Sequence, residues 1–315
     1  MTKLFCDVGG THVRFAYEQD DGSLSVPVKR LVSDYVSFTE AIRAYIHSQS
    51  IDPLAVTDFY FAFSNRNGWD VRPESIRAIL PTAFIKQIND FEANAYGIAH
   101  APEDSFQCLY KGIGQPPPHA EKAVIGVGTG LGFAFITAAG GIVPNHGGHI
   151  MPPIRNQSDL ALFEWIKSHK NQKTISIIED VLSGAGLHYI YQYLCKGAHC
   201  DVEFGSTEDI MVRGLDDRMV QNSLNIFHEM LGLVMHQVVG IRSAYGGVYL
   251  TGGMIDKLQI AGKLDVETMI EHVRLNTHPV VRKSIDSTNF YWVKDEYISL
   301  VGLQRYAALK PQSMG

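Results

Sequence analysis

The sequence predicts an α/β fold that contains two related sheets. Two observations lead to this prediction. Short apolar segments that run into glycine-rich turns and then into a second apolar segment occur in both halves of the chain, at 4–17 and at 123–137. Such pairs are typical of β-hairpins. Each pair is followed by segments in which a strand leads into a helix, which is how helices come to cover a sheet. No short-period repeat is visible, so a solenoid or a propeller is not expected.

In the first half we expect strands at 4–7, 13–17, 27–31, 56–63 and 84–88. Ser33 or Asp34 is expected to cap a helix that runs through Ile46. The inner positions predicted for this helix are Val36, Ile42, Tyr45 and Ile46. A second helical pattern covers 91–100 and begins at Asn89-Asp90.

In the second half, three consecutive prolines mark 112–119 as a loop or a domain boundary. We expect strands at 123–127, 131–137, 248–250 and 290–293. Helical patterns cover 159–169, 184–194, 219–242 and 296–309. The pattern at 219–242 is long and largely apolar, which predicts a buried helix.

Composition excludes several classes of protein. A chain of 315 residues suggests two domains. The net charge of −6 is unsuited to nucleic-acid binding, which needs a concentrated basic face. Four cysteines are too few for a disulfide scaffold, and the spacing of Cys195 and Cys200 near two histidines matches no standard zinc motif, so we expect structural thiols. We expect no membrane span and a cytoplasmic location.

Glycine is in excess, with 29 residues, and the excess concentrates in three turns at strand ends. They are Asp7-Val8-Gly9-Gly10-Thr11, Gly126-Val127-Gly128-Thr129-Gly130 and the pair of Gly-Gly elements within 246–253. Free backbone N–H groups in such turns can bind phosphate oxygens. A tight hairpin alone would explain any single turn, but three together favour a phosphate site. None of them matches a Walker A loop or a Rossmann fingerprint.

In their order along the chain, these turns resemble the two phosphate motifs and the adenosine motif of the sugar kinase/actin/heat-shock-ATPase superfamily. Within it, the chain resembles the bacterial glucokinase family. Further matches are Asn89-Asp90-Phe91-Glu92-Ala93, Gly147-Gly148-His149 and the stretch from Glu179 to Leu187. The resemblance runs from Leu4 to the final helix.

The resemblance implies ATP-dependent phosphorylation of a hexose, as in glucose to glucose 6-phosphate. It makes Asp90 the general base for the sugar hydroxyl and Asn89 a partner of neighbouring hydroxyls. Both residue types also favour helix N-caps, which is the alternative explanation for this pair. Asp7 would hold Mg²⁺ through water, or would only initiate a turn.

The resemblance also assigns the remaining site residues. ATP would contact Gly9, Gly10, Thr11, Gly128, Thr129, Gly130, Gly252 and Gly253. The sugar would contact His146, His149 and Glu179, besides Asn89 and Asp90. His149 could instead be an ordinary surface or core histidine, or form a metal pair with His146.

The resemblance further implies two RNase-H-like domains with an interdomain cleft. The smaller domain would comprise 1–109 and 299–315, and the larger would comprise 110–298. The first would carry one phosphate motif and Asp90, and the second the other nucleotide motifs and further sugar-binding residues. A homodimer is also implied.

Three departures from the family pattern concern mainly the sugar side. His146 stands where the pattern has glutamate before Gly-Gly-His. A Thr-Asn-x-x-Trp element is absent near 63–76, and the closing Asn-Pro-Gly-Leu-x-Gly segment survives loosely at 298–302. We therefore expect a kinase whose sugar, or affinity for sugar, differs from that of an ordinary glucokinase. A non-catalytic sugar or nucleotide sensor and an acyl-phosphate kinase are the alternatives.

Overall fold

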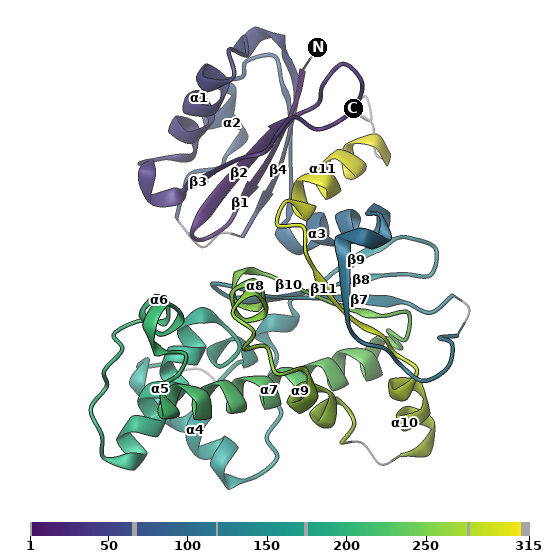
Figure 1. Ribbon diagram of the computed structural model, residues 1–315. Helices are drawn as coiled ribbons and strands as arrows, with labels where there is room; N and C mark the ends of the chain where they lie inside the picture. The colour runs from purple at the N-terminus through teal and green to yellow at the C-terminus, as the bar shows by residue number, and fades with distance from the viewer. Residues whose placement is uncertain (1, 65–67, 118, 173–175, 276–277, 310–315) are drawn as a thin grey trace. The chain divides into compact units, whose positions relative to one another are not determined.

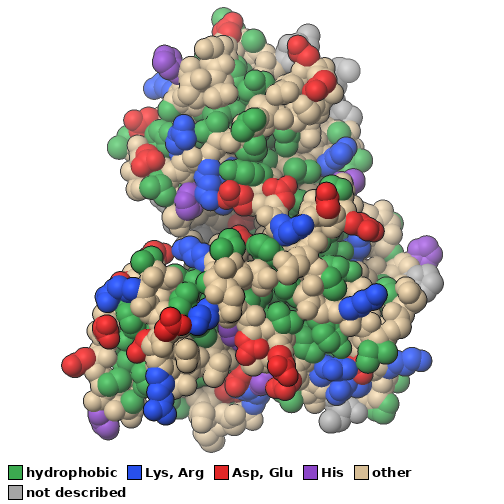
Figure 2. Space-filling model, in the orientation of Figure 1, with side chains coloured by type: hydrophobic (Ala, Val, Ile, Leu, Met, Phe, Trp, Pro, Cys, Tyr) green, Lys and Arg blue, Asp and Glu red, His purple; other side chains and the backbone are tan. Residues whose placement is uncertain are grey.

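The computed structural model describes the chain except residues 1, 65–67, 118, 173–175, 276–277 and 310–315 (Figure 1). The chain divides into two compact units. The first unit comprises 1–105 together with 295–315, and the second comprises 106–294. On the face drawn in Figure 2, acidic and basic side chains are interspersed on both units.

The first unit is built on a five-stranded sheet of order β3-β2-β1-β4-β5. Its strands are β1 (Thr2–Val8), β2 (His12–Tyr17), β3 (Val28–Leu31), β4 (Val56–Phe63) and β5 (Phe84–Asn89). The first three strands are antiparallel neighbours, whereas β1, β4 and β5 run parallel. The expected β-hairpin and the three further strands are confirmed.

Helices cover both faces of this sheet. On one face lie α1 (Phe38–Ser48) and α2 (Pro73–Arg77), which bury Phe38, Ile42 and Ile76 against alternate side chains of β1 and β4. On the other lie α3 (Asp90–His100) and α11 (Ile298–Leu309), and Tyr306 of α11 contacts the ring of Tyr60 on β4.

The start of α1 differs from the prediction. Ser37, rather than Ser33 or Asp34, caps the helix, because its side chain accepts a hydrogen bond from the Glu40 amide. Residues 32–34 form a separate 3-10 turn, and Val36 therefore lies outside the helix and is 90% exposed. The other three predicted inner positions, at 42, 45 and 46, are buried.

The helices α3 and α11 cross at two glycines. A Cβ on Gly302 would lie 1.7 Å from the Ala93 carbonyl oxygen, and one on Gly97 would lie 2.1 Å from the Ile298 carbonyl oxygen. No side chain fits at either distance. This contact fixes the closing helix of the chain against α3.

The second unit repeats the topology of the first. Its sheet has the order β6-β11-β10-β7-β8-β9. Its strands are β6 (Phe106–Tyr110), β7 (Lys122–Val127), β8 (Leu131–Ile136), β9 (Ile142–Pro144), β10 (Val248–Thr251) and β11 (Phe290–Val293). From β9 to β11, the strand order and the parallel and antiparallel pairings match those from β3 to β5. The prediction of two related sheets is thus confirmed, with β6 as an additional edge strand.

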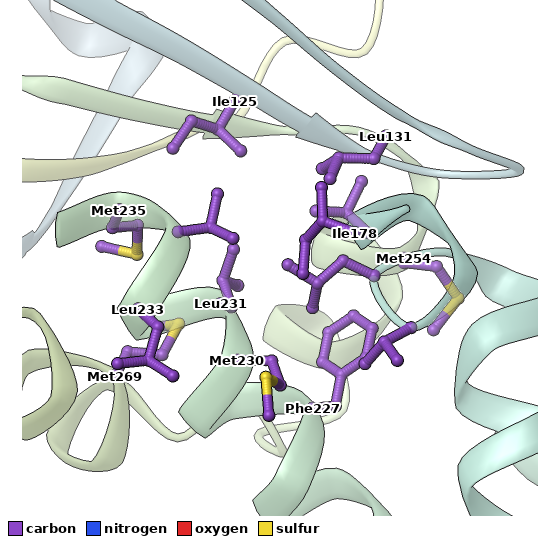
Figure 3. Close-up of a cluster of buried hydrophobic side chains, with 14 of the residues drawn as sticks. Ile125, Leu131, Ile178, Phe227, Met230, Leu231, Leu233, Met235, Met254 and Met269 are labelled. Carbon is purple, nitrogen blue, oxygen red and sulfur yellow. The ribbon is translucent and has the colours of Figure 1, made fainter. Parts of the chain in front are cut away.

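A large apolar core lies between this sheet and the helices of the second unit. These helices are α4 (Gln157–His169), α5 (Gly184–Ala198), α6 (Thr207–Asp209), α7 (Arg218–Arg242), α8 (Gly253–Ile260), α9 (Val266–Val273) and α10 (Pro279–Asp286). Figure 3 shows Phe227, Met230 and Leu231 of α7 grouped with side chains such as Ile178 and Met254.

The long helix α7 is buried, as its sequence predicts. Among the described helices, it is long and apolar enough to cross a membrane, contrary to the expectation that no segment would be. However, 61% of its most apolar stretch is buried inside the structure, which is the behaviour of a core helix.

Candidate active site

The glycine turn between β1 and β2 follows a buried carboxylate. Gly9, Gly10 and Thr11 connect the two strands, and the Gly9 amide donates to the His12 carbonyl oxygen at 2.9 Å. Asp7, the second-last residue of β1, is only 9% exposed. The turn itself is more open, since Thr11 is exposed.

Two donors bind the same oxygen of Asp7. Arg14 Nη1 lies 3.1 Å from Asp7 Oδ2, and Ser299 Oγ donates to that oxygen at 2.9 Å. The carboxylate therefore bonds to β2 and to α11, and does not cap the turn that follows it, which was the alternative role for this aspartate. Arg14 lies directly opposite Asp7 in the antiparallel register of the hairpin.

Asn89 and Asp90 lie at the same sheet edge as this turn. Val8 pairs with Phe63, and Phe63 pairs with Asn89, so the ends of β1, β4 and β5 are level. Neighbouring strands are about 4.8 Å apart, which places Asn89 roughly 10 Å from the end of β1. The sheet thus gathers the first glycine turn and the Asn-Asp pair at one edge of the first unit.

Asn89 caps α3, as its alternative role predicts. Its Oδ1 accepts hydrogen bonds from the Phe91 amide at 2.9 Å and from the Glu92 amide at 3.3 Å. Asp90 Oδ1 also accepts from the Phe91 amide, at 3.0 Å. The cap leaves the Asn89 amide group as a donor and fixes the first residue of α3, which is Asp90.

Three glycine-rich segments converge in the second unit. The Gly128 amide donates to the Gly130 carbonyl oxygen, and the Gly128 carbonyl oxygen accepts from the Gly184 amide, both at 2.8 Å. A Cβ on Gly128 would lie 3.7 Å from the Gly253 nitrogen. The β7–β8 turn therefore lies beside the first residues of both α5 and α8.

This convergence suits an anion. Helix N-termini carry partial positive charge and unpaired N–H groups, which favour phosphate. Gly252, before α8, has a φ of +99°, and its absent Cβ would lie 2.6 Å from the Val127 carbonyl oxygen. Only glycine combines that backbone conformation with that approach. The predicted residues Gly128, Gly252 and Gly253 are thus brought together.

The 146–149 segment is pressed against β8. Gly147–His149 form a 3-10 turn. A Cβ on Gly148 would lie 2.1 Å from the Leu131 carbonyl oxygen, and one on Gly147 would lie 1.8 Å from a Phe133 ring carbon. Both glycines are therefore required by close packing. His146 and His149 are exposed, with ring centroids 6.3 Å apart.

Glu179 lies against the same strand as this turn. Its Oε2 accepts a hydrogen bond from the Leu131 amide at 2.8 Å. The neighbouring Ile178 amide donates to the Ile150 carbonyl oxygen at 3.0 Å. These bonds bring Glu179 and the His149 turn, separated along the chain by α4, to one place on the second unit.

Sequence analysis misses several residues that hold these groups. Asn145 Oδ1 accepts from the Gly147 amide at 2.8 Å and so shapes the histidine turn. Arg14 could have been found, because hairpin pairing places it opposite Asp7. Ser299 could not, because no local pattern links residues so distant in the sequence.

The described part of the chain holds no cluster of three or more His, Cys, Asp or Glu suited to a metal. The alternative that His146 and His149 form a metal pair therefore finds no further ligand among these residues. Cys195 and Cys200 are free thiols, and burial raises the pKa of Cys195. Cys195 is buried, as expected of a structural cysteine, whereas Cys200 is exposed.

These features define a class of protein: an ATP-dependent sugar phosphotransferase with the actin-like fold of two related sheets. A family model described as glucokinase matches residues 4–310. A glucokinase from Agrobacterium fabrum is 30% identical over 270 residues, which cover 81% of this chain and 78% of the relative. The chain belongs to the glucokinase family.

Solved structures share the fold. The glucokinase of Balamuthia mandrillaris in complex with glucose matches with a TM-score of 0.79 at 18% identity, over 98% of this chain and 93% of that one. A ROK family glucokinase from Streptomyces griseus, in complex with glucose and AMPPNP, matches with a TM-score of 0.66 at 13% identity, over 98% and 100% of the two chains.

Proposed function

We propose that the protein transfers the γ-phosphoryl group of ATP to a hydroxyl of a hexose, with glucose as the reference acceptor. The observation that carries this proposal concerns one end of the first sheet. Asp90, the first residue of α3, lies there level with the end of β1 and its glycine turn. A family member that had become a sensor would have no chemical need for both Asp90 and Asp7.

In this proposal Asp90 takes the proton of the attacking hydroxyl. The hydroxyl oxygen bonds to the γ-phosphorus, the bond from that phosphorus to the β-phosphate oxygen breaks, and ADP leaves. Phosphoryl transfer depends mainly on positioning and on neutralising charge. The Asn89 amide group donates to a neighbouring sugar hydroxyl, while its Oδ1 keeps α3 capped.

The nucleotide would be held by the glycine turns: Gly9, Gly10 and Thr11 in the first unit and Gly128, Thr129, Gly130, Gly252 and Gly253 in the second. The Gly9 and Gly128 amides donate within their own turns, so these two residues would allow close backbone approach rather than supply N–H donors. The threonine hydroxyls add donors to phosphate oxygens. The convergence of the second group around two helix N-termini supports this assignment.

The residues fit Mg²⁺ held through water at Asp7. Both hydrogen bonds that the structure gives its carboxylate fall on Oδ2, which leaves Oδ1 as an acceptor for a metal-bound water. Mg²⁺ keeps several of its waters and needs few carboxylates beside the phosphates. When bound, the ion neutralises phosphate charge.

We propose that His146, His149 and Glu179 bind sugar hydroxyls and that His146 alters the affinity or choice of sugar. A carboxylate accepts two hydroxyl hydrogen bonds, whereas a neutral imidazole offers one donor and one acceptor. Loss of one charge-assisted bond costs about 1.5–3 kcal/mol, which is roughly ten- to a hundredfold in binding.

The test is ADP release measured with a panel of hexoses, amino sugars and N-acetylated sugars, with acetate included. Sugar-dependent release that Asp90→Asn abolishes supports the proposal. Sugar binding without turnover across the panel would indicate a sensor, and acetate-dependent release an acyl-phosphate kinase. Turnover of glucose with an ordinary glucokinase KM would contradict the proposal that His146 alters the affinity or choice of sugar.

Two further properties belong to this proposal. A homodimer is implied by the family resemblance, and sedimentation of the purified protein tests it. A reducing, cytoplasmic location agrees with the four free cysteines, and fractionation of the source cells tests it.

A further inference from the structure

We propose that Ser299 is a positioning residue: together with Arg14 it fixes the Asp7 carboxylate so that Oδ1 is presented to hydrated Mg²⁺ on the nucleotide. This inference rests on the proposed function, because it concerns how the kinase holds its metal–nucleotide complex. It assigns a role in that site to α11, whose sequence carries none of the predicted site residues.

The Arg14 contact alone does not fix the carboxylate. It is a single contact at 3.1 Å from Nη1, and Arg14 Nε is buried without a hydrogen-bond partner. A guanidinium group fixes a carboxylate best when two parallel N–H groups bind both oxygens. With one contact, the Asp7 carboxylate could still rotate about its χ2 bond.

Ser299 removes that freedom. Its hydroxyl reaches the same oxygen at 2.9 Å from another element, the first turn of α11. Two donors that approach Oδ2 from different elements define its position and therefore that of Oδ1. The start of α11 also favours a carboxylate through the partial positive charge of the helix N-terminus.

The pair is buried and its support is rigid. Ser299 is 3% exposed and Asp7 is 9% exposed. The glycine crossing at Gly97 and Gly302 prevents α11 from shifting, and Tyr306 contacts the rings of Tyr60 and Tyr96. Because α11 is held in place, the Ser299 hydroxyl can orient the Asp7 carboxylate that accepts its hydrogen bond.

The closing family pattern carries no hydroxyl at the position of Ser299. When the closing pattern Asn-Pro-Gly-Leu-x-Gly is aligned so that it ends at Gly302, position 299 is its first glycine. Glycine has no hydroxyl to donate. A glycine at this position is therefore compatible with the fold, and Ser299→Gly is a variant that the backbone should accept.

The experiment measures stabilisation of the protein by ADP during a Mg²⁺ titration, with EDTA as the metal-free reference. We expect Ser299→Ala and Ser299→Gly to raise the Mg²⁺ concentration for half-maximal stabilisation about two- to tenfold, as expected for loss of one hydrogen bond. Ser299→Thr, which keeps the hydroxyl, should restore the wild-type value. ADP binding in EDTA should not change.

Ser25→Ala is the matched control. Ser25 is also a buried serine of the first unit, and its Oγ accepts from the Tyr17 amide, away from Asp7. It should lower stability without moving the Mg²⁺ midpoint.

A wild-type midpoint in both Ser299→Ala and Ser299→Gly would overturn the inference, and so would an equal shift in Ser25→Ala. Absence of sugar-dependent ADP release in the wild-type protein would instead count against the proposed function, so the two failures are distinguishable.

Discussion

The two glycine hairpins have the same position in their sheets but different chemistry. In the β1–β2 hairpin, the second residue pair from the turn is Asp7 opposite Arg14. In the β7–β8 hairpin, the corresponding pair is Gly126 opposite Gly132. One copy of the repeated topology therefore carries a partly buried ion pair where the other carries no side chains at all.

Under the proposed function, the two copies of the topology divide one reaction between them. The first unit supplies fixed carboxylates, which can bind a hydrated metal or accept a proton. The second supplies backbone amides and helix N-termini, which suit phosphate oxygens, and a histidine turn on β8. We therefore expect substitutions in the first unit to change kcat and those in the histidine turn to change KM for sugar.

Asp90→Asn should produce the largest effect and fall on kcat. Removal of a general base typically lowers the rate 10²- to 10⁴-fold. The KM for sugar should change only a few-fold, since the Asn89 cap of α3 remains. Steady-state ADP release measures both constants. Glu92→Gln, in the same helical turn, is the control and should stay within a few-fold of wild type; retention of a tenth of kcat by Asp90→Asn would contradict the assignment.

His146→Glu should lower the KM for hexose about ten- to a hundredfold with little change in kcat. The reason is that a carboxylate adds a charge-assisted acceptor on the sugar side. His47→Glu makes the same charge change at an exposed position of α1 and should leave KM unaltered. An unchanged or higher KM in His146→Glu would remove His146 from the sugar site.

Gly302→Ala tests the crossing of α3 and α11 in the first unit through protein stability rather than through activity. A methyl group 1.7 Å from the Ala93 carbonyl oxygen must separate α3 from α11, and such overpacking costs about 1–3 kcal/mol. Thermal unfolding should show the loss. Gly240→Ala is the control, because that helical glycine has no atom within 4 Å of the added Cβ. Equal melting temperatures for the two variants would contradict the crossing.

His228 should make the second unit acid-sensitive. This histidine of α7 is 1% exposed, and burial lowers its pKa to about 4, against 6.5 for the unfolded chain, although nearby Asp265 opposes the shift. The unfolded state therefore binds the proton more tightly, so the contribution of His228 to stability falls as pH decreases below about 6.5 and levels off near pH 4. The loss at pH 5 should be about 2 kcal/mol.

Denaturant unfolding at pH 7.5 and pH 5 measures this loss. In His228→Gln, the difference in free energy of unfolding between the two pH values should shrink by about that amount. His47→Gln, at an exposed histidine, should leave the difference as in wild type. A full wild-type difference in His228→Gln would locate the acid sensitivity elsewhere.

The strands and both hairpins could be predicted because their patterns are local: apolar segments end at glycine-rich turns and resume directly after them. The cap of α1 was misplaced because Ser33, Asp34 and Ser37 are all capable caps, and only packing chooses among them. Asn89 illustrates a different limit, since a capping residue and a substrate-binding residue look the same in sequence. The Ser299–Asp7 bond lay beyond prediction, because residues 292 positions apart share no local pattern.

The crossing of α3 and α11 has a consequence for biosynthesis. All five strands of the first sheet precede the second unit in the sequence, but α11 follows it. During translation, the face of that sheet around Asp7 stays uncovered while residues 106–294 are made, on the order of tens of seconds. The face of the first sheet around Asp7 is therefore covered last. During this interval, that face is most exposed to aggregation or to binding by a chaperone.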